Sequence, residues 1–500
     1  MKLTSSRRGR IFVVLILIAC LVRLFLYIRS KSFASRLPVV EPCHPVIGNA
    51  MLVVGMSSEQ LFNNLSRALA NPAKLFRVMA TVMPVVVTND PDMTQRILTS
   101  PDCLEKAFLY KFFRLDSGLF AANYDLWKAQ RKAINPTFNL KILHKFIPLF
   151  DKYAQELVQT LGAFADGRAL NLSPFMHRCS MKTICATTMG VVIDEDSDAD
   201  RFAELLQKTF HLAFKRLFHV HWHVDWMYRL TKDYKKDEKI REEIYKYGDE
   251  IMRKAAERHS RRMNLFKRED DDCCKLQIFM DQMLNTNSGK KFSDIEINHN
   301  FYTMIVGGSD TTGIFLGYIA IALAANQDIQ EKVYQEICTV YPRNKEVIFT
   351  PESLNQLLYT DMFLKECLRL FPVVPMVVRK TLRDVDLNGF QVPKGNILIV
   401  SIYNLHRRKD IWGPNANRFD PENFSAERCA GRHPYAFIPF SGGNRNCLGY
   451  RYAMINMKIV VVHLLRTFKL TSDWRLEDLR FRFEALLKTA ADPEIRLVRR

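Results

Sequence analysis

The sequence predicts a mostly α-helical fold with smaller β-sheets, of the α+β class, preceded by one N-terminal membrane anchor helix. Helical periodicity of apolar residues dominates the chain after residue 50. Hydrophobic residues make up 48% of the 500, enough to fill a large core. An uninterrupted apolar run from Ile11 to Val22, resumed from Leu24 to Ile28, comes close to the ~20 residues that a spanning helix needs.

Three segments follow from this pattern: residues 1–30 form the anchor, 31–49 a Pro-rich hinge and 50–500 one large domain without internal linkers. A cleaved signal peptide is the competing interpretation of the N-terminus. The 11 cysteines are odd in number and scattered, which suits reduced thiols better than a secreted disulfide framework and so favours the uncleaved anchor. Basic residues flank the apolar run on both sides, so flanking charge does not orient it.

Periodicity also places the individual elements. The helices predicted most strongly cover about 125–134, 146–164, 235–262, 295–325, 353–371 and 449–467. Strands are expected between Lys74 and Asp90, and hairpins between Val377 and Ile402 around the turn signal Asn388-Gly389.

The residues around Cys447 suit a thiolate that binds a metal in a flat cofactor. Gly442-Gly443 permits a tight loop whose backbone N–H groups can turn toward the sulfur, and Phe440 can cover it. Arg445 can reach a carboxylate of the cofactor as a charge-assisted partner. Gly449 has no side chain, so a macrocycle can approach its backbone. The alternative is a buried structural cysteine after a Gly-rich turn.

The full pattern F-x-x-G-x-R-x-C-x-G, met by Phe440, Gly443, Arg445, Cys447 and Gly449, resembles the heme-binding signature of the cytochromes P450. The resemblance implies the cytochrome P450 fold enclosing heme b, with Cys447 as the axial ligand of the iron. The flanking sequence resembles the membrane-bound microsomal type, and most of all family 4 and its insect relatives.

A second motif, Gly307 to Thr312, resembles the oxygen-activation motif of the same family. A threonine hydroxyl can bond the carbonyl four residues back, here that of Gly307, and the glycines Gly307 and Gly308 are expected to leave room beside the iron. The resemblance assigns a proton route to Asp310 and a hydroxyl that holds the distal oxygen to Thr311. Relatives in family 4 often carry a glutamate that esterifies the heme at the place of Gly307, so non-covalent heme is expected here.

Further positions match the family pattern. Glu366 and Arg369 resemble its structural E-x-x-R pair, whose usual third partner, an arginine, is replaced here by Asn423, which predicts a pair plus an amide. Trp127, Arg131 and Arg379 resemble residues that contact the heme propionates, with Trp127 and Arg131 on one helix face by their spacing.

The expected function is a heme-thiolate monooxygenase that inserts one oxygen atom from O2 into a small lipophilic substrate: a fatty acid, terpenoid hormone, steroid or xenobiotic. No flavin or dinucleotide fingerprint follows a strand, so electrons must come from a partner. Resemblance implies NADPH-cytochrome P450 reductase, with cytochrome b5 as a second partner, and a catalytic domain on the cytosolic face of the endoplasmic reticulum membrane. Arg408, Lys409, Arg428 and Arg451 are candidate docking residues.

Two alternatives stay open. A heme-thiolate isomerase or peroxide-handling enzyme would not activate oxygen, and relatives of that kind typically lack the pair that Asp310 and Thr311 supply. A membrane-tethered basic binding protein is suggested by the net charge of +19. Basic residues are interleaved with acids along the whole chain rather than gathered with aromatics, which argues against nucleic acid as a partner.

Overall fold

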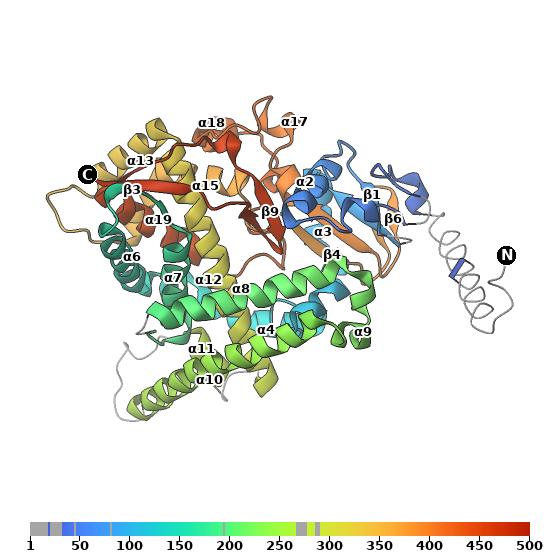
Figure 1. The fold of residues 1–500 in the computed structure, drawn as a ribbon, viewed down its shortest axis with the longest axis horizontal. Coiled ribbons are helices and arrows are strands. Elements are labelled where there is room, and N and C mark those ends of the chain that lie inside the picture. The colour runs from blue at the N-terminus through green and yellow to red at the C-terminus, as the bar shows by residue number, and fades with distance from the viewer. Residues whose placement is uncertain are drawn as a thin grey trace. The chain divides into compact units, whose positions relative to one another are not determined.

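The computed structural model describes residues 19–20, 33–44, 47–80, 83–193, 196–266, 278–285 and 291–500 (Figure 1). The expected anchor at 1–30 lies outside these residues except for 19 and 20. The chain groups into two compact units. Unit 1 comprises Met1–Ala107, Met376–Leu405 and His433–Arg445, and unit 2 comprises Phe108–Pro375, His406–Arg432 and Asn446–Arg500.

Unit 1 is built on a four-stranded sheet in the order β1-β2-β7-β4. β2 pairs antiparallel with β1 and parallel with β7, and β4 pairs antiparallel with β7. β5 and β6 form the predicted hairpin, in which Asn388 and Gly389 have φ values of 60° and 88°, as a tight two-residue turn needs. The strands are β1 (Phe76–Ala80), β2 (Met83–Thr88), β4 (Met376–Lys380), β5 (Val385–Leu387), β6 (Phe390–Val392) and β7 (Ile397–Ser401), and the helices are α2 (Ser58–Ala68), α3 (Pro91–Thr99) and α16 (Ile402–Leu405).

The described part of the Pro-rich hinge packs on this sheet. The backbone N–H of Val40 donates to the carbonyl of Arg77 in β1 over 3.0 Å. The side-chain amide of Asn49, buried at 3% exposure, donates to the carbonyls of Val40 and Pro42. These contacts make Val40, Pro42 and Asn49 part of the folded unit.

Unit 2 is mostly helical and carries two small sheets. Its helices are α4 (Tyr124–Ile134), α5 (Leu140–Lys145), α6 (Ile147–Gly162), α7 (Ser173–Ile184), α8 (Asp196–Phe218), α9 (Asp225–Arg229), α10 (Lys232–Phe266), α11 (Phe279–Leu284), α12 (Asp294–Ala325), α13 (Gln327–Val340), α14 (Pro351–Asn355), α15 (Leu358–Leu370), α17 (Lys409–Trp412), α18 (Ala426–Cys429) and α19 (Tyr450–Thr467). The sheets are β3-β11-β8, from Asp166–Asn171, Glu494–Arg499 and Phe468–Thr471, and β10-β9, from Leu486–Thr489 and Phe481–Glu484.

Five of the six predicted helices are confirmed to within a few residues, and the sixth is wrong in one respect. The helix expected over 353–371 is two helices, α14 and α15, separated at Gln356 and Leu357. The cause is a tertiary contact. The carboxylate of Glu336 in α13 accepts the backbone N–H groups of Tyr359 and Thr360 over 2.6 and 2.8 Å, and so caps a new helix start.

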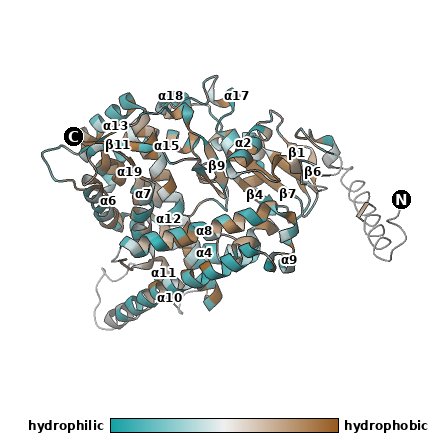
Figure 2. Ribbon diagram, viewed as in Figure 1, coloured by the Kyte–Doolittle hydropathy of each residue, from teal (hydrophilic) through white to brown (hydrophobic). Residues whose placement is uncertain are grey.

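The core of unit 2 is organised around α12. Ser293 and Glu296 close a capping box at its N-terminus. Most of its residues are buried, and α7 packs along it (Figure 1). Within the described ranges it is the one helix apolar and long enough to cross a membrane, but 78% of that apolar stretch is buried by protein, as in a core helix. Figure 2 shows the contrast with α10, which is largely hydrophilic.

Candidate active site

The turn of α12 around Gly307 interrupts the burial of this core helix. Gly307 is exposed, although it stands between buried residues such as Val306 and Ser309. Thr303 and Thr311, one turn to either side on the same face, are half-buried. A methyl group added at Gly307 would meet no atom within 4 Å. This face of α12 therefore borders open space at a turn midway along the helix.

Thr311 makes the predicted hydrogen bond. Its hydroxyl donates to the carbonyl of Gly307 over 2.6 Å, and the chain remains α-helical through this turn. The hydroxyl oxygen keeps lone pairs that can accept a hydrogen bond from a neighbouring molecule. A fixed hydroxyl at the edge of an open space can hold a small polar ligand.

Gly308 does not have the role expected from the sequence. A methyl group at this position would lie 2.3 Å from Cδ1 of Ile184 in α7. The expectation that both glycines leave room beside the iron is therefore wrong for Gly308, because α7 fills that room. Gly308 permits close helix packing, and of these two glycines only Gly307 faces open space.

Asp310 points toward the packed side of α12 and is 6% exposed. Its Oδ1 accepts the amide N–H of Gln207 in α8 over 3.0 Å and lies 3.2 Å from Nε2 of His177 in α7. Burial raises the pKa of Asp310, but the nearby His177 ring, the charge of Lys488 and the hydrogen bond from Gln207 outweigh it, so the net pKa shift is downward. Asp310 is thus held as a carboxylate inside a helical layer.

The Cys447 loop is fastened from α4. Nη1 and Nη2 of Arg131 donate to the backbone and side-chain oxygens of Asn446 over 3.0 and 2.9 Å. Cys447 itself is exposed. Burial raises the pKa of its thiol, while a hydrogen bond from the backbone N–H of Gly449 and the positive charge of Arg131 act in the opposite direction. The net pKa shift of the Cys447 thiol is upward, but the thiol is accessible and lies next to two groups that favour its thiolate.

Trp127 lies one turn before Arg131 on α4 and is buried at 5% exposure. Its ring packs near that of Tyr124, with the centroids 6.2 Å apart. The one-turn spacing puts Trp127 and Arg131 on the same helix face, as predicted. Their expected contact with propionates remains a prediction.

The E-x-x-R pair is a fully buried network. Arg369 donates through Nε and Nη2 to the two carboxylate oxygens of Glu366, both over 2.7 Å. The remaining guanidinium N–H groups donate to the carbonyls of His406, Ala416 and Arg418. The amide of Asn423 donates to Glu366 over 3.2 Å, so the structure contains the expected pair plus an amide. Burial raises the pKa of Glu366 and outweighs the hydrogen bonds and the charge of Arg369, which lower it.

In unit 1, Arg379 and Arg445 share a cluster of cations with a residue that the sequence did not indicate, Lys106. Arg379 stands on β4 and donates to the hydroxyl of Ser441 over 3.4 Å. Burial lowers the pKa of Lys106 far below its ordinary value, and the charges of Arg379 and Arg445 lower it further. The backbone N–H of Lys380 in β4 donates to the carbonyl of Glu105 and so fixes the position of the neighbouring Lys106. No local sequence pattern predicts this pairing.

The loop before Cys447 needs its glycine. Gly443 has a φ of 66°, and a methyl group there would lie 1.8 Å from the carbonyl oxygen of Leu98 at the end of α3. Phe440, three residues earlier in the same unit, is half-buried. The loop is therefore seated on α3 by backbone contact.

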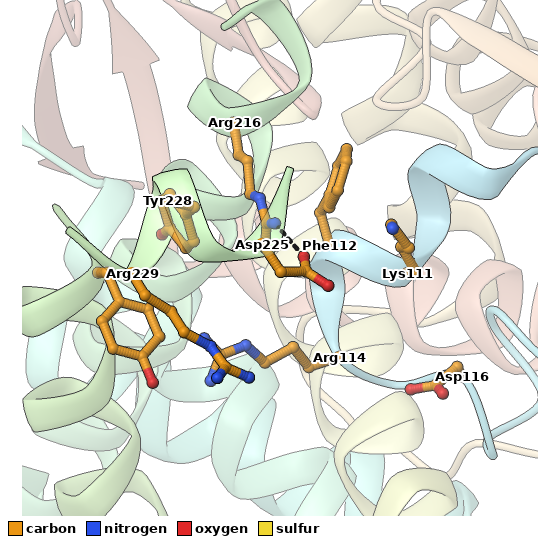
Figure 3. Close-up of a pocket in the computed structure, with 9 residues that line it drawn as sticks. Lys111, Phe112, Arg114, Asp116, Arg216, Asp225, Tyr228 and Arg229 are labelled. Atoms are coloured by element: carbon orange, nitrogen blue, oxygen red, sulfur yellow. Dashed lines mark hydrogen bonds and ion pairs between the residues drawn. The ribbon is translucent and has the colours of Figure 1, made fainter. Parts of the chain in front are cut away.

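A separate polar cavity of about 250 Å³ lies elsewhere in unit 2 (Figure 3). Four of its side chains are cationic and two acidic: Lys111, Arg114, Arg216, Arg229, Asp116 and Asp225. Arg216 pairs with Asp225 and stacks between the rings of Phe112 and Tyr228, at 4.4 and 4.2 Å. The cations are thus largely engaged by acids and aromatic rings, which suits a structural cluster.

The residues of each unit fit the heme that the sequence implies. In unit 2, Cys447 offers a sulfur with a backbone N–H donor and a nearby arginine, and Gly307 leaves space on the core helix. In unit 1, Lys106, Arg379 and Arg445 gather positive charge of the kind that buried carboxylates require. Among the described residues, no group of three or more His, Cys, Asp or Glu side chains is placed to hold a metal ion.

Comparison with known proteins agrees with this geometry. The family model for cytochrome P450 matches residues 38–490. A probable cytochrome P450 313a4 of Drosophila melanogaster is 29% identical over 486 residues, which cover 95% of this chain and 96% of that protein. Cytochrome P450 4c21 of Blattella germanica is 27% identical and covers 97% of each chain. Human cytochrome P450 4V2 is 28% identical over 97% of this chain and 94% of its own. The chain therefore belongs to the cytochrome P450 family.

Proposed function

We propose that this cytochrome P450 is a membrane-bound heme-thiolate monooxygenase in which Cys447 ligates the iron of a non-covalent heme b. The accessible thiol of Cys447, with the N–H of Gly449 and the charge of Arg131 beside it, carries the proposal. When bound, the heme supplies the reduction of O2 and the insertion of one oxygen atom into a C–H bond or double bond. The protein's own contribution is to position the substrate and to deliver protons.

The test is the absorption spectrum of the reduced carbon monoxide complex. The natural protein should show the red-shifted Soret band of a thiolate ligand, and Cys447→Ser should lose it. Cys429→Ser changes another exposed cysteine of unit 2 and should keep the band. Retention of the band by Cys447→Ser would overturn the assignment.

Asp310 is proposed to supply a proton route, and Thr311 to hold the distal oxygen through its hydroxyl. The reaction returns the second oxygen atom as water and so consumes two protons and two electrons for each product. Thr311, fixed by its bond to Gly307, can accept a hydrogen bond at the open face of α12. Asp310, the preceding residue, is the nearest carboxylate along the chain and is held by His177 and Gln207.

Non-covalent attachment rests on Gly307. An ester to the heme needs a carboxylate side chain at the open face of α12, and Gly307 offers none. Acidic organic solvent should therefore extract the heme from the polypeptide. Heme that stays with the polypeptide after extraction would contradict this part of the proposal.

The substrate is proposed to be a small lipophilic molecule: a fatty acid, terpenoid hormone, steroid or xenobiotic. The residues of α12 beside Gly307, such as Met304 and Val306, are apolar, which favours an apolar ligand over a charged one. A panel of these four classes, read by the shift of the Soret band on binding and followed by product analysis with reductase present, separates them.

Electrons are proposed to come from NADPH-cytochrome P450 reductase, with cytochrome b5 as a second donor, at the cytosolic face of the endoplasmic reticulum membrane. Of the four candidate docking cations, Arg408 pairs with Asp410 and Arg428 with Asp420, over 2.7 and 2.6 Å. Lys409 and Arg451 are exposed, and Arg451 lies in the first turn of α19, four residues after Cys447. Lys409 and Arg451 are therefore the stronger candidates.

A further inference from the structure

A second cavity, of about 30 Å³, lies inside unit 2, and α8, α10 and α12 supply most of its wall. Part of the wall is apolar, with side chains such as Leu206, Phe210 and Val306. Two arginines, Arg114 and Arg241, also line the cavity, and none of the described residues around it is acidic. The cavity therefore combines apolar walls with positive charge.

Three polar side chains of this wall, one from each helix, are buried without a partner. Thr209 on α8, Arg241 on α10 and Tyr302 on α12 are only 4% to 8% exposed. Oγ1 of Thr209, Nη2 of Arg241 and the hydroxyl of Tyr302 have no hydrogen-bond partner among the residues that the structure describes. Because an unbonded buried donor is costly, several of them around one cavity indicate a site that a ligand completes.

Arg241 is held in place through one edge of its guanidinium. Its Nε donates to both carboxylate oxygens of Asp237, one turn earlier on α10, over 3.1 Å. Asp237 also lies 3.4 Å from Nη2 of Arg114, which pairs in addition with the half-buried Glu238. The buried carboxylate of Asp237 thus serves two guanidinium groups, and Nη2 of Arg241 keeps its N–H groups for another acceptor.

His299 on α12 adds a further donor to the wall. The backbone N–H of Ser117 donates to Nδ1 of His299 over 3.0 Å, so the hydrogen of the neutral ring is on Nε2. Burial lowers the pKa of His299 and, with the charge of Arg241, outweighs the opposing charge of Asp116, which favours this neutral form. Arg241 and His299 can therefore only donate to a ligand in the cavity, so the cavity favours an acceptor.

A carboxylate matches the size and the chemistry of this cavity. A volume of about 30 Å³ admits about two water-sized atoms, since one water needs roughly 10–15 Å³ of such space. A carboxylate brings two acceptor oxygens and one negative charge, and it forms charge-assisted bonds with a guanidinium and with hydroxyl groups. A neutral carbonyl or hydroxyl brings a single oxygen and no charge.

We propose that this cavity binds the carboxylate of an amphipathic substrate, held by Arg241, Thr209 and Tyr302, which rests on the function proposed above. The apolar body of the substrate leaves the cavity past Val306, the neighbour of Gly307 at the open face of α12. The carboxylate does not react, so these three residues determine specificity and are not catalytic. A straight-chain fatty acid and an isoprenoid acid both carry the required group.

The experiment measures binding to the ferric holoprotein at pH 7.4 by isothermal titration calorimetry. Dodecanoic acid and farnesoic acid are each compared with their methyl ester, which has the same apolar body but no charge. At least one acid should bind about tenfold more tightly than its ester, and the acid that does so distinguishes a straight-chain from an isoprenoid body. Absence of this preference in both pairs would overturn the proposal.

Variants test whether the preference arises in this cavity. Arg241→Gln removes the charge, whereas Tyr302→Phe and Thr209→Val each remove a hydroxyl that has no partner among the described residues. The affinity ratio of acid to ester should fall about tenfold in Arg241→Gln and about threefold in each hydroxyl variant, while the affinity for the ester stays unchanged. If Arg241→Gln does not fold, the two hydroxyl variants decide the question.

Tyr341→Phe is the matched control. The hydroxyl of Tyr341 is buried elsewhere in unit 2, 2.8 Å from Oγ of Ser353, so this variant should keep the natural ratio of affinities. A natural ratio in Arg241→Gln and in both hydroxyl variants would mean that the acid binds elsewhere and only water occupies the cavity. That result would overturn the proposal.

Calorimetry also separates this proposal from the one on which it rests, because heat of binding does not depend on turnover or on the iron ligand. An acid preference that the variants reduce, together with a Soret band that survives Cys447→Ser, would contradict the heme-thiolate assignment and support the carboxylate site. Loss of the band in Cys447→Ser without any acid preference in the natural protein would overturn the carboxylate site alone.

Discussion

At the scale of single residues, Gly307 and Gly308 are neighbours with opposite surroundings. Alanine at Gly307 would meet open space, whereas alanine at Gly308 would press on Ile184 of α7. Because alanine favours a helix over glycine by about 0.5–1 kcal/mol, Gly307→Ala should leave thermal stability unchanged or raise it. Gly308→Ala should cost about 1–3 kcal/mol through overpacking.

Unfolding midpoints of the two holoproteins test this difference. Ile184→Ala makes room for the added methyl group, so it should recover part of the loss when combined with Gly308→Ala. Equal destabilisation by both glycine variants would contradict the different roles assigned to them. The sequence motif treats the two glycines alike, and only the packing of α7 separates them.

A second residue-scale prediction concerns His406, which is fully buried in the Arg369 network. Burial and the charges of Arg369 and Arg407 lower its pKa to about 3. In the unfolded chain an imidazole binds a proton near pH 6.5, so below that pH the unfolded state holds more protons than the folded one. Stability should therefore fall as pH drops from about 6.5 toward 3, by about 2 kcal/mol at pH 5 from this group.

The measurement is the unfolding midpoint between pH 5 and pH 8. His406→Gln should show a shallower loss toward acid than the natural protein, whatever its stability at pH 8. His221→Gln, which changes an exposed histidine of unit 2, should keep the natural slope. An unchanged slope in His406→Gln would mean that another titrating group causes the loss of stability at acidic pH.

Residue-scale prediction from the sequence succeeded where a contact is local. The bond from Thr311 to Gly307 spans four residues of one helix, so it could be predicted from spacing alone, and it is present. Lys106 was missed because its neighbours Arg379 and Arg445 are hundreds of residues away in the chain. His177 was missed for the same reason, since α7 carries no pattern that points to Asp310.

At the scale of elements, the break between α14 and α15 shows the same limit. Apolar periodicity runs across 353–371, but the carboxylate of Glu336 caps Tyr359 and Thr360 from another helix. Glu336→Ala should remove the cap and cost about 1–2 kcal/mol, as losses of N-terminal caps do. Glu336→Gln keeps an oxygen that accepts one N–H and should lose less.

Unfolding of both variants, with Glu331→Ala in the same helix as the control, checks this expectation. Glu331 is about half exposed and contacts Arg500 over 3.2 Å, so its loss should cost less than 1 kcal/mol. If Glu336→Ala were as mild as Glu331→Ala, the cap would not be what starts α15. The strands of unit 1, by contrast, were predictable because alternation and the Asn388-Gly389 turn are local signals.

At the scale of the whole molecule, the net charge of +19 determines which partners the protein attracts. The proposed function explains this charge by an acidic electron donor and a membrane surface rather than by nucleic acid. Attraction between opposite charges is screened by salt, with a Debye length of about 8 Å at physiological ionic strength. Reduction of the ferric protein by the reductase should therefore slow as salt increases.

Charge-reversal variants test which exposed cations form the docking surface for the reductase. Lys409→Glu and Arg451→Glu should slow stopped-flow reduction about tenfold at low salt and flatten its salt dependence, because rim charges act mainly on association. Lys246→Glu changes an exposed cation of α10 by the same charge and should have little effect. Equal slowing by all three reversals would mean that net charge alone, and no particular surface near α19, governs the encounter with the reductase.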